Sequence, residues 1–170
     1  MPRRFPRRYY RNRDKYSIEQ TSFLSSSVAN WQGIQAIPGE TQASLQWECL
    51  IVPADDTQGM RKVKHLSIKL CNAGNDAMPL WYALVYVPQG YVTQNLRLSE
   101  VGSSTYLYPA NQFVMASGVV DFSAGPTFIR CPLSRNLNSG DRIVLMMATY
   151  TTAPSANQIA GEVTYAVTLQ

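Results

Sequence analysis

Apolar side chains at every second position are the feature that most restricts how this chain folds. The alternation runs through residues 43–51, 66–70 and 163–169, and it is typical of strands with one face buried and one face in solvent. No stretch shows a helical period over more than about one turn. Clusters of Pro, Gly, Asn and Asp separate the runs. The expected strands are residues 43–51, 61–71, 80–87, 95–98, 113–121, 127–131, 142–151 and 162–169. The sequence therefore predicts an all-β antiparallel sandwich or barrel.

Two of these runs are apolar at both odd and even positions, namely residues 80–87 and 143–148. Strands of this kind are buried on both faces, so we expect them to lie between two layers or beneath a neighbouring subunit. The alternation also slips by one residue at Lys64 and His65, and this slip predicts a β-bulge there. Gly118 is expected to mark a second bulge.

Positive charge is concentrated in the first sixteen residues. They hold seven Lys or Arg and one Asp, a net charge of +6, whereas the other 154 residues hold eight Lys or Arg and ten Asp or Glu, a net charge of −2. The chain is therefore a slightly acidic body with a cationic arm, and the partner of the arm should be a polyanion. Pro2 and Pro6 oppose helix formation in the arm, so we expect it to be extended or disordered until it is bound.

Arginine and aromatic side chains alternate along the arm, which suits single-stranded nucleic acid. Guanidinium groups bind phosphate in a bidentate manner, and aromatic rings stack on unpaired bases at about 1–3 kcal/mol per base. The expected nucleic-acid contacts are Arg3, Arg4, Arg7, Arg8, Tyr9, Tyr10, Arg11, Arg13, Lys15 and Tyr16. Arg61, Lys62 and Lys64 are second-rank contacts if their end of the strand faces the nucleic acid, and an ordinary solvated strand end explains them equally well. A solvated basic tail that serves only in nuclear import is the alternative for the arm.

The chain divides into a basic arm (1–16), a connector with a weak pattern (17–41) and a β body (42–170). Charged residues make up 15% of the chain, well below the usual quarter. This deficit suggests that other subunits cover part of the body. A surface rich in uncharged polar residues would explain it equally well.

The residues needed for common catalytic and metal sites are missing. His65 is the one histidine, which excludes metal sites with two or three histidines, and it has no nucleophile motif beside it. No C-x-x-C pair and no phosphate-binding glycine loop occurs. We therefore expect no enzyme activity, metal or cofactor, and we expect Cys49, Cys71 and Cys131 to be buried thiols. The longest apolar run, eight residues, is far shorter than the roughly 20 that span a bilayer, so we expect no membrane partner.

Four short segments resemble the capsid proteins of small circular Rep-encoding single-stranded DNA viruses, the circo-like group. They are the opening Pro-Arg-Arg-Phe-Pro-Arg-Arg-Tyr-Tyr, the strand start Arg-Lys-Val-Lys at 61–64, Leu-Tyr-Pro-Ala-Asn-Gln at 107–112, and Ser-Arg-Asn-Leu-Asn-Ser-Gly-Asp-Arg-Ile at 134–143. The resemblance implies a single jelly roll of two four-stranded antiparallel sheets. It also implies an icosahedral shell of about sixty copies around a single-stranded DNA genome.

The same resemblance implies where the protein acts and which partners it has. The arm would lie inside the shell on the genome and would also engage the host nuclear import machinery. The expected locations are therefore the virion and the host nucleus, with a host receptor that the sequence does not identify.

Two other functions remain open from the residues. One is the capsid of a satellite RNA virus, which shares the same plan. The other is a monomeric β-barrel module that binds nucleic acid and carries a basic tail. Such modules usually hold basic and aromatic residues on the barrel itself, whereas the body of this chain is net acidic.

Overall fold

The computed structural model describes residues 16–24, 31–32, 44–56, 59–72, 79–98, 106–121, 125–150 and 159–169. These residues form ten strands and one short 3-10 turn, η2 (Asn111–Phe113). The strands are β1 (Ser17–Leu24), β2 (Trp31–Gln32), β3 (Ser44–Val52), β4 (Arg61–Asn72), β5 (Pro79–Val87), β6 (Val114–Asp121), β7 (Thr127–Cys131), β8 (Arg135–Leu137), β9 (Arg142–Tyr150) and β10 (Ile159–Leu169).

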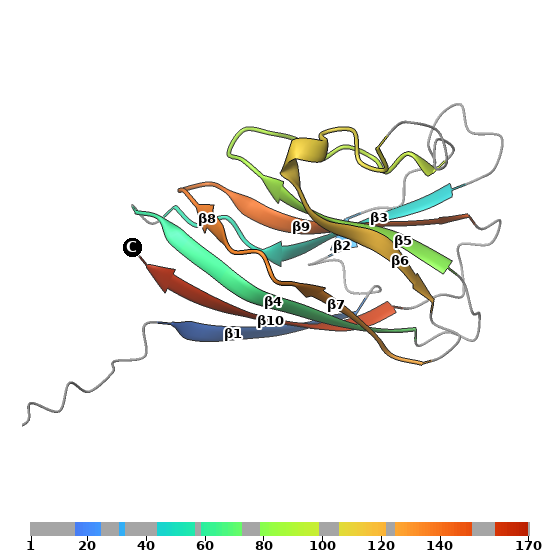
Figure 1. Ribbon diagram of the computed structural model, residues 1–170, viewed down its shortest axis with the longest axis horizontal. Coiled ribbons are helices and arrows are strands. Elements are labelled where there is room, and N and C mark those ends of the chain that lie inside the picture. Colours follow the sequence, from blue (N-terminus) through green and yellow to red (C-terminus); the bar gives the residue numbers. More distant parts are fainter. Residues whose placement is uncertain are drawn as a thin grey trace, which may run out of the picture.

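The strands form two sheets that pack face to face (Figure 1). Sheet A has the order β1-β10-β4-β7, and the short strand β8 also pairs with β4. Sheet B has the order β2-β3-β9-β5-β6. Every pairing is antiparallel.

The pairing is nested along the chain, and this nesting defines the fold. β1 pairs with β10, β3 with β9, β4 with β7, and β5 with β6, so early strands meet late strands in reverse order. One long antiparallel hairpin folded over into two sheets has this order, and the resulting architecture is a jelly roll. The predicted jelly-roll sandwich is confirmed. Each sheet has five strands and not four, because β2 and β8 are added to the eight principal strands.

Three local expectations differ from the structure. The expected connector at 17–41 contributes β1 and β2, so sheet A begins at Ser17. The alternation is weak there because residues 16–22 at the sheet edge are exposed on both faces. Residues 95–98 form no strand. Gly118 is not a bulge: it pairs directly with Tyr82, and a Cβ at Gly118 would lie 3.1 Å from that ring. The irregularity in the β5–β6 pairing lies at Met115 of β6, opposite the step from Leu84 to Val85.

The apolar side chains form two layers of core, one on each face of sheet B. The larger layer lies between the sheets and includes Ile68, Leu84 and Leu145. The second lies on the outer face of sheet B, where Val85 and Val144 pack beneath a long segment that follows β5. We call this segment, residues 91–98 and 106–113, the cover segment. Figure 1 shows it above β5 and β9, on the side of sheet B away from sheet A. The doubly apolar strands therefore lie between two layers of their own chain.

Three apolar side chains of the cover segment, Leu96, Leu98 and Tyr108, are buried against sheet B. Burial of each contributes about 1.5–3 kcal/mol. The backbone of the segment is held by Gln46 on β3, whose side chain is only 3% exposed. The Gln46 amide donates to the Leu96 carbonyl at 2.8 Å and accepts from the Leu96 N–H at 2.8 Å. One glutamine thus satisfies both polar backbone groups of a buried residue that belongs to no sheet.

A buried carboxylate fixes the turn between β8 and β9. Asp141 accepts hydrogen bonds from the Tyr86 hydroxyl at 2.7 Å, the Asn138 N–H at 2.8 Å and the Gln89 N–H at 3.0 Å. Burial alone would raise the pKa of Asp141, but these donors stabilise the carboxylate and lower its pKa below the ordinary value. Burial and the hydrogen bond to Asp141 raise the pKa of Tyr86 to about 12. The network ties the end of β5 to the start of β9.

Replacing Gln46 with Met should destabilise the protein strongly. Methionine keeps the volume of the side chain but leaves the N–H and carbonyl of Leu96 buried without partners. The expected loss in free energy of unfolding is about 2–6 kcal/mol, at about 1–3 kcal/mol for each of the two unsatisfied groups. Urea unfolding followed by circular dichroism measures it. Gln20→Met, on the exposed edge strand β1, is the matched control and should cost no more than about 0.5 kcal/mol. Equal effects at the two positions would contradict this role of Gln46.

Candidate nucleic-acid interface

The outer face of sheet A is the candidate binding surface. Residues paired across antiparallel strands share a face, and the register places Lys62, Lys64 and Lys69 of β4 beside Thr168, Ala166 and Glu162 of β10. The same register puts Phe128 beside Lys69 and Arg130 beside Ser67. The inward residues of β4, including Val63 and Ile68, are buried in the core. We call the outward set of Lys62, Lys64, Lys69 and Arg130 the basic face.

A β-bulge at His65 is what brings these cations to one face. His65 and Leu66 of β4 stand opposite the single residue Tyr165 of β10, and the register shifts there. His65 adopts φ 55°, a left-handed conformation that is uncommon outside glycine. Because side chains alternate along a strand, Lys64 and Lys69 would point to opposite faces of a regular strand. The extra residue restores them to the same face, and the predicted bulge is confirmed.

The basic face has a net positive charge among the described residues of sheet A. Its four cations face one carboxylate, Glu162, so four minus one gives +3. Glu162 lies 3.1 Å from Lys69 Nζ and also accepts a hydrogen bond from Gln20. The exposed pair partly neutralises Lys69. Lys62, Lys64 and Arg130 are therefore the cations best placed for phosphate.

Aromatic rings flank the cations at both ends of the basic face. The Nζ of Lys64 lies 3.8 Å from the centre of the Tyr16 ring, a cation–π contact. Tyr16 is the last residue of the predicted arm, so this contact fixes where the arm joins the body. At the other end, Phe128 is 53% exposed, and the guanidinium of Arg130 lies 5.9 Å from its ring centre. Exposed rings beside cations can stack on bases whose phosphates are held nearby.

Arg61 does not belong to this face. Its side chain is only 12% exposed and contacts the other side of β4, where it donates to the Pro53 carbonyl at 3.0 Å and the Asp141 carbonyl at 3.4 Å. It also lies 3.8 Å from a carboxylate oxygen of Asp55. Arg61 therefore supports the loop before β4 and is unavailable to phosphate. The sequence could not separate it from Lys62 and Lys64, because the inward position depends on its pairing with Leu137 of β8.

The remaining predicted contacts lie outside the described residues. These are Arg3, Arg4, Arg7, Arg8, Tyr9, Tyr10, Arg11, Arg13 and Lys15. Sequence reasoning also missed Lys69, Phe128 and Arg130. The signal for them was present in the alternation of residues 67–69 and 128–130, but it required the β4–β7 register to be interpreted.

The cysteines differ from expectation at one position. Cys49 and Cys131 are buried as predicted, whereas Cys71, near the end of β4, is exposed. Burial, with a smaller contribution from Glu48, raises the pKa of Cys49 to about 12. Burial also raises the pKa of Cys131. These two thiols are therefore poor nucleophiles.

Within the described residues, no group of three or more His, Cys, Asp or Glu side chains is placed to hold a metal ion. No helix among them has the length and apolar character needed to cross a membrane.

No protein-family model and no curated protein sequence matches this chain. Among solved structures, a full particle of Israeli acute paralysis virus heated to 63 degrees aligns at 12% identity and TM-score 0.36, covering 92% of this chain and 74% of the other. The Israel acute paralysis virus pentamer aligns at 11% identity and TM-score 0.31, covering 89% of this chain and 86% of the other. The enzymatically active domain of bacteriophage CBA120 tailspike protein 4 aligns at 13% identity and TM-score 0.28, covering 92% of this chain and 20% of the other. The fold assignment rests on the nested strand pairing and not on these alignments.

Because His65 adopts a positive φ, substitutions at this position test the bulge directly. His65→Val should destabilise the protein by about 1–2 kcal/mol, because a β-branched residue is strained at positive φ. His65→Gly should be nearly neutral, since glycine adopts this φ freely. Urea unfolding of both variants measures the difference. A valine variant as stable as the glycine variant would show that residue 65 is not held at positive φ.

Proposed function

We propose that this chain is a viral coat protein that self-assembles into a small icosahedral shell and packages single-stranded DNA. The observation that carries the proposal is the set of four cations gathered on one outer face of the sandwich. Four cations lie on the outer face of sheet A, and the cover segment packs over β5 and β9 on the outer face of sheet B. A subunit whose cations lie on one side can turn that side toward a packaged polyanion and its other side toward the outside of a shell.

The arm and the basic face act as one surface in this proposal. Tyr16 lies on Lys64, so the arm joins the body on the side that carries the lysines. Fifteen residues extend to about 50 Å, which allows the seven cations of the arm to reach phosphates well beyond the sheet. Lys62 and Lys64 are two strand residues apart, about 6.6 Å, and can therefore neutralise separate phosphates. Tyr16 and Phe128 would stack on bases, which favours a single strand over a duplex.

Assembly would supply the affinity that one subunit lacks. Each contact between a cation and a phosphate is weak and is screened by salt. Many copies on one strand would bind cooperatively through their high effective concentration. The few charged side chains in the chain fit subunits that cover one another's surfaces. In the infected cell the arm would also engage nuclear import, as clustered Lys and Arg do.

The basic face also favours a second function, a monomeric module that binds nucleic acid. Such modules hold basic and aromatic residues on the sheet itself, and sheet A has both. The charge of sheet A therefore fits both functions equally. They differ in assembly, because a coat protein forms a shell and the module stays a monomer. The capsid of a satellite RNA virus differs from the first proposal only in its cargo, which nuclease sensitivity of the packaged nucleic acid identifies.

Sedimentation of the purified full chain is the test of assembly. A shell of about sixty copies would sediment as a particle of about 1.1 MDa, against 19.0 kDa for the single chain. Deletion of residues 2–15 should leave shells that lack nucleic acid, as measured by the ratio of absorbance at 260 and 280 nm. Monomers at all concentrations and salt conditions would favour the module. Full packaging by the truncated protein would contradict the role of the arm.

Removing charge from the basic face should weaken binding in a way that depends on salt. For Lys62→Gln with Lys64→Gln, the plot of log affinity against log salt should become less steep by about 1.4, or 0.7 for each lost contact to a single strand. Fluorescence anisotropy with a labelled oligothymidine measures the slope. Arg97→Gln, in the cover segment, removes a cation on the other side of sheet B and should leave the slope unchanged. A slope that changes with Arg97 and not with the lysines would reject the basic face.

A further inference from the structure

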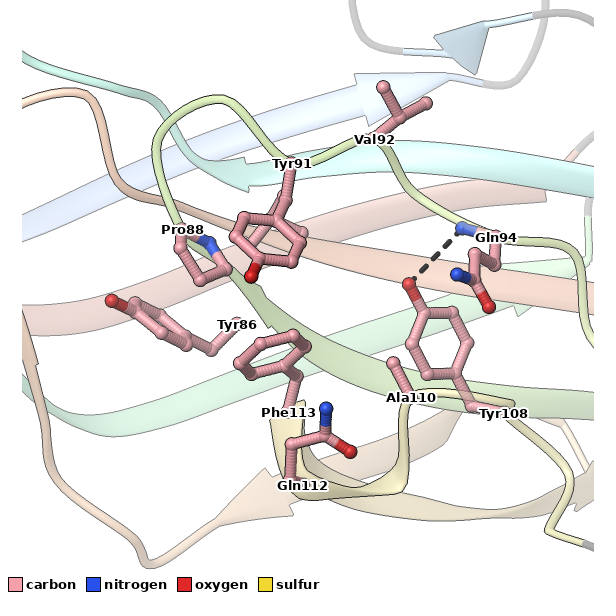
Figure 2. A pocket seen from close by; sticks show the side chains of 10 residues that line it. Tyr86, Pro88, Tyr91, Val92, Gln94, Tyr108, Ala110, Gln112 and Phe113 are labelled. Carbon is pink, nitrogen blue, oxygen red and sulfur yellow. Dashed lines mark hydrogen bonds between the residues drawn. The ribbon is translucent and has the colours of Figure 1, made fainter.

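A small aromatic pocket lies at the end of β5, between that strand and the cover segment. Its volume is about 150 Å³, and four aromatic rings and two glutamines contribute to its walls. Figure 2 shows Tyr91 and Phe113 on one side of the pocket, and Tyr108 with Gln94 on the other. The pocket is lined by the end of β5 and by the cover segment. Figure 1 shows the cover segment on the side of sheet B away from sheet A, whose outer face carries the cations. The cations of the basic face therefore do not contribute to this pocket.

Hydrogen bonds hold part of the pocket wall in place before any ligand arrives. Tyr86 donates to Asp141 at 2.7 Å, and Tyr108 accepts from the N–H of Gln94 at 3.1 Å. The backbone of Tyr91 is held on both sides, because its N–H donates to the Pro88 carbonyl at 3.1 Å and its carbonyl accepts from Arg142 at 3.3 Å. Preorganised walls lower the entropic cost of binding.

The ring geometry favours a puckered ligand over a flat one. Tyr91 meets Phe113 at 75° with centroids 5.5 Å apart, and Tyr86 meets Phe113 at 67° and 6.1 Å. Both contacts are edge-to-face, so neither pair offers two parallel faces between which a planar base would be sandwiched. A saturated six-membered ring instead places its axial C–H groups against one aromatic face and its rim against another.

The polar groups of the pocket are uncharged and available. The side-chain amides of Gln94 and Gln112 and the hydroxyl of Tyr91 make no hydrogen bond within the described part of the chain. Each amide offers donors and an acceptor, and the hydroxyl offers both. No charged side chain lines the pocket, so a charged ligand would lose its hydration without compensation. The ligand should therefore be neutral and carry hydrogen-bonding groups on its rim.

We propose that this pocket binds one uncharged pyranose ring of a glycan. A cavity of about 150 Å³ accommodates a single six-membered ring. The apolar face of the sugar would pack on Tyr91 and Phe113, and its hydroxyl groups would bond to Gln94 and Gln112. A nucleotide fits less well, because its phosphate would find no cation in the lining. The inference is independent of the proposed function, since it uses neither the arm nor the basic face.

Saturation-transfer NMR on the full chain tests the proposal with defined probes. The probes are the methyl glycosides of mannose, galactose, glucose and N-acetylglucosamine, with adenosine and thymidine as planar alternatives. One sugar ring should bind with a Kd of about 1 mM, so probes at about 10 mM would nearly saturate the site. We expect saturation transfer to the ring protons of at least one glycoside and to neither nucleoside.

Variants locate the binding. Tyr91→Ala and Gln112→Ala should each weaken the affinity for the glycoside by about tenfold. Both positions are exposed, so the variants should remain folded, which circular dichroism checks. Tyr106→Ala removes an exposed tyrosine that does not line the pocket and should leave binding unchanged. The proposal is overturned if no glycoside receives saturation, if only a nucleoside does, or if transfer survives both pocket variants.

Discussion

The structure depends on the need of β5 and β9 to bury both of their faces. Their side chains are apolar on each side, so sheet B is stable only when two layers cover it. Sheet A provides one layer and the cover segment provides the other. The cover segment has no strand of its own, and its buried backbone at Leu96 is satisfied by the side chain of Gln46. The cover segment encloses the outer face of β5 and β9, whereas Leu50 of β3 and Val119 of β6 stay exposed at its margins. No such segment covers the outer face of sheet A among the described residues, and its cations are therefore open to solvent.

That remaining face carries the cations because of one extra residue in β4. The strand must place Val63, Leu66 and Ile68 in the core, and a regular strand cannot do so, since position 63 differs in parity from positions 66 and 68. The extra residue at His65 lets Val63, Leu66 and Ile68 all point into the core. It also places the lysines of β4 together on the outer face. Core packing and the charge pattern thus depend on a single irregularity. The contact of Tyr16 with Lys64 then attaches the arm to the same side.

The sequence predicted the features that depend on local pattern. The strands with clear alternation, the two doubly buried strands, the bulge at His65 and the jelly roll are all present. The edge strand β1 was missed because a strand exposed on both faces has no apolar period. Residues 95–98 were mistaken for a strand because Leu96 and Leu98 alternate, although the backbone of Leu96 bonds to the Gln46 side chain and not to a strand. The pattern alone did not show that Arg61 points inward or that Lys69, Phe128 and Arg130 share the outer face, because the face of each depends on pairing between distant strands.

Photo-crosslinking most directly tests the central claim that nucleic acid binds the outer face of sheet A. An oligonucleotide containing 5-bromodeoxyuridine crosslinks to aromatic side chains that stack on its bases, and mass spectrometry of the digested protein identifies the peptides. The account predicts crosslinks to the peptides that contain Tyr16 and Phe128 and none to those that contain Tyr91 or Tyr106. Crosslinks confined to Tyr91 and Tyr106 would contradict it, because they would place the strand on the cover segment.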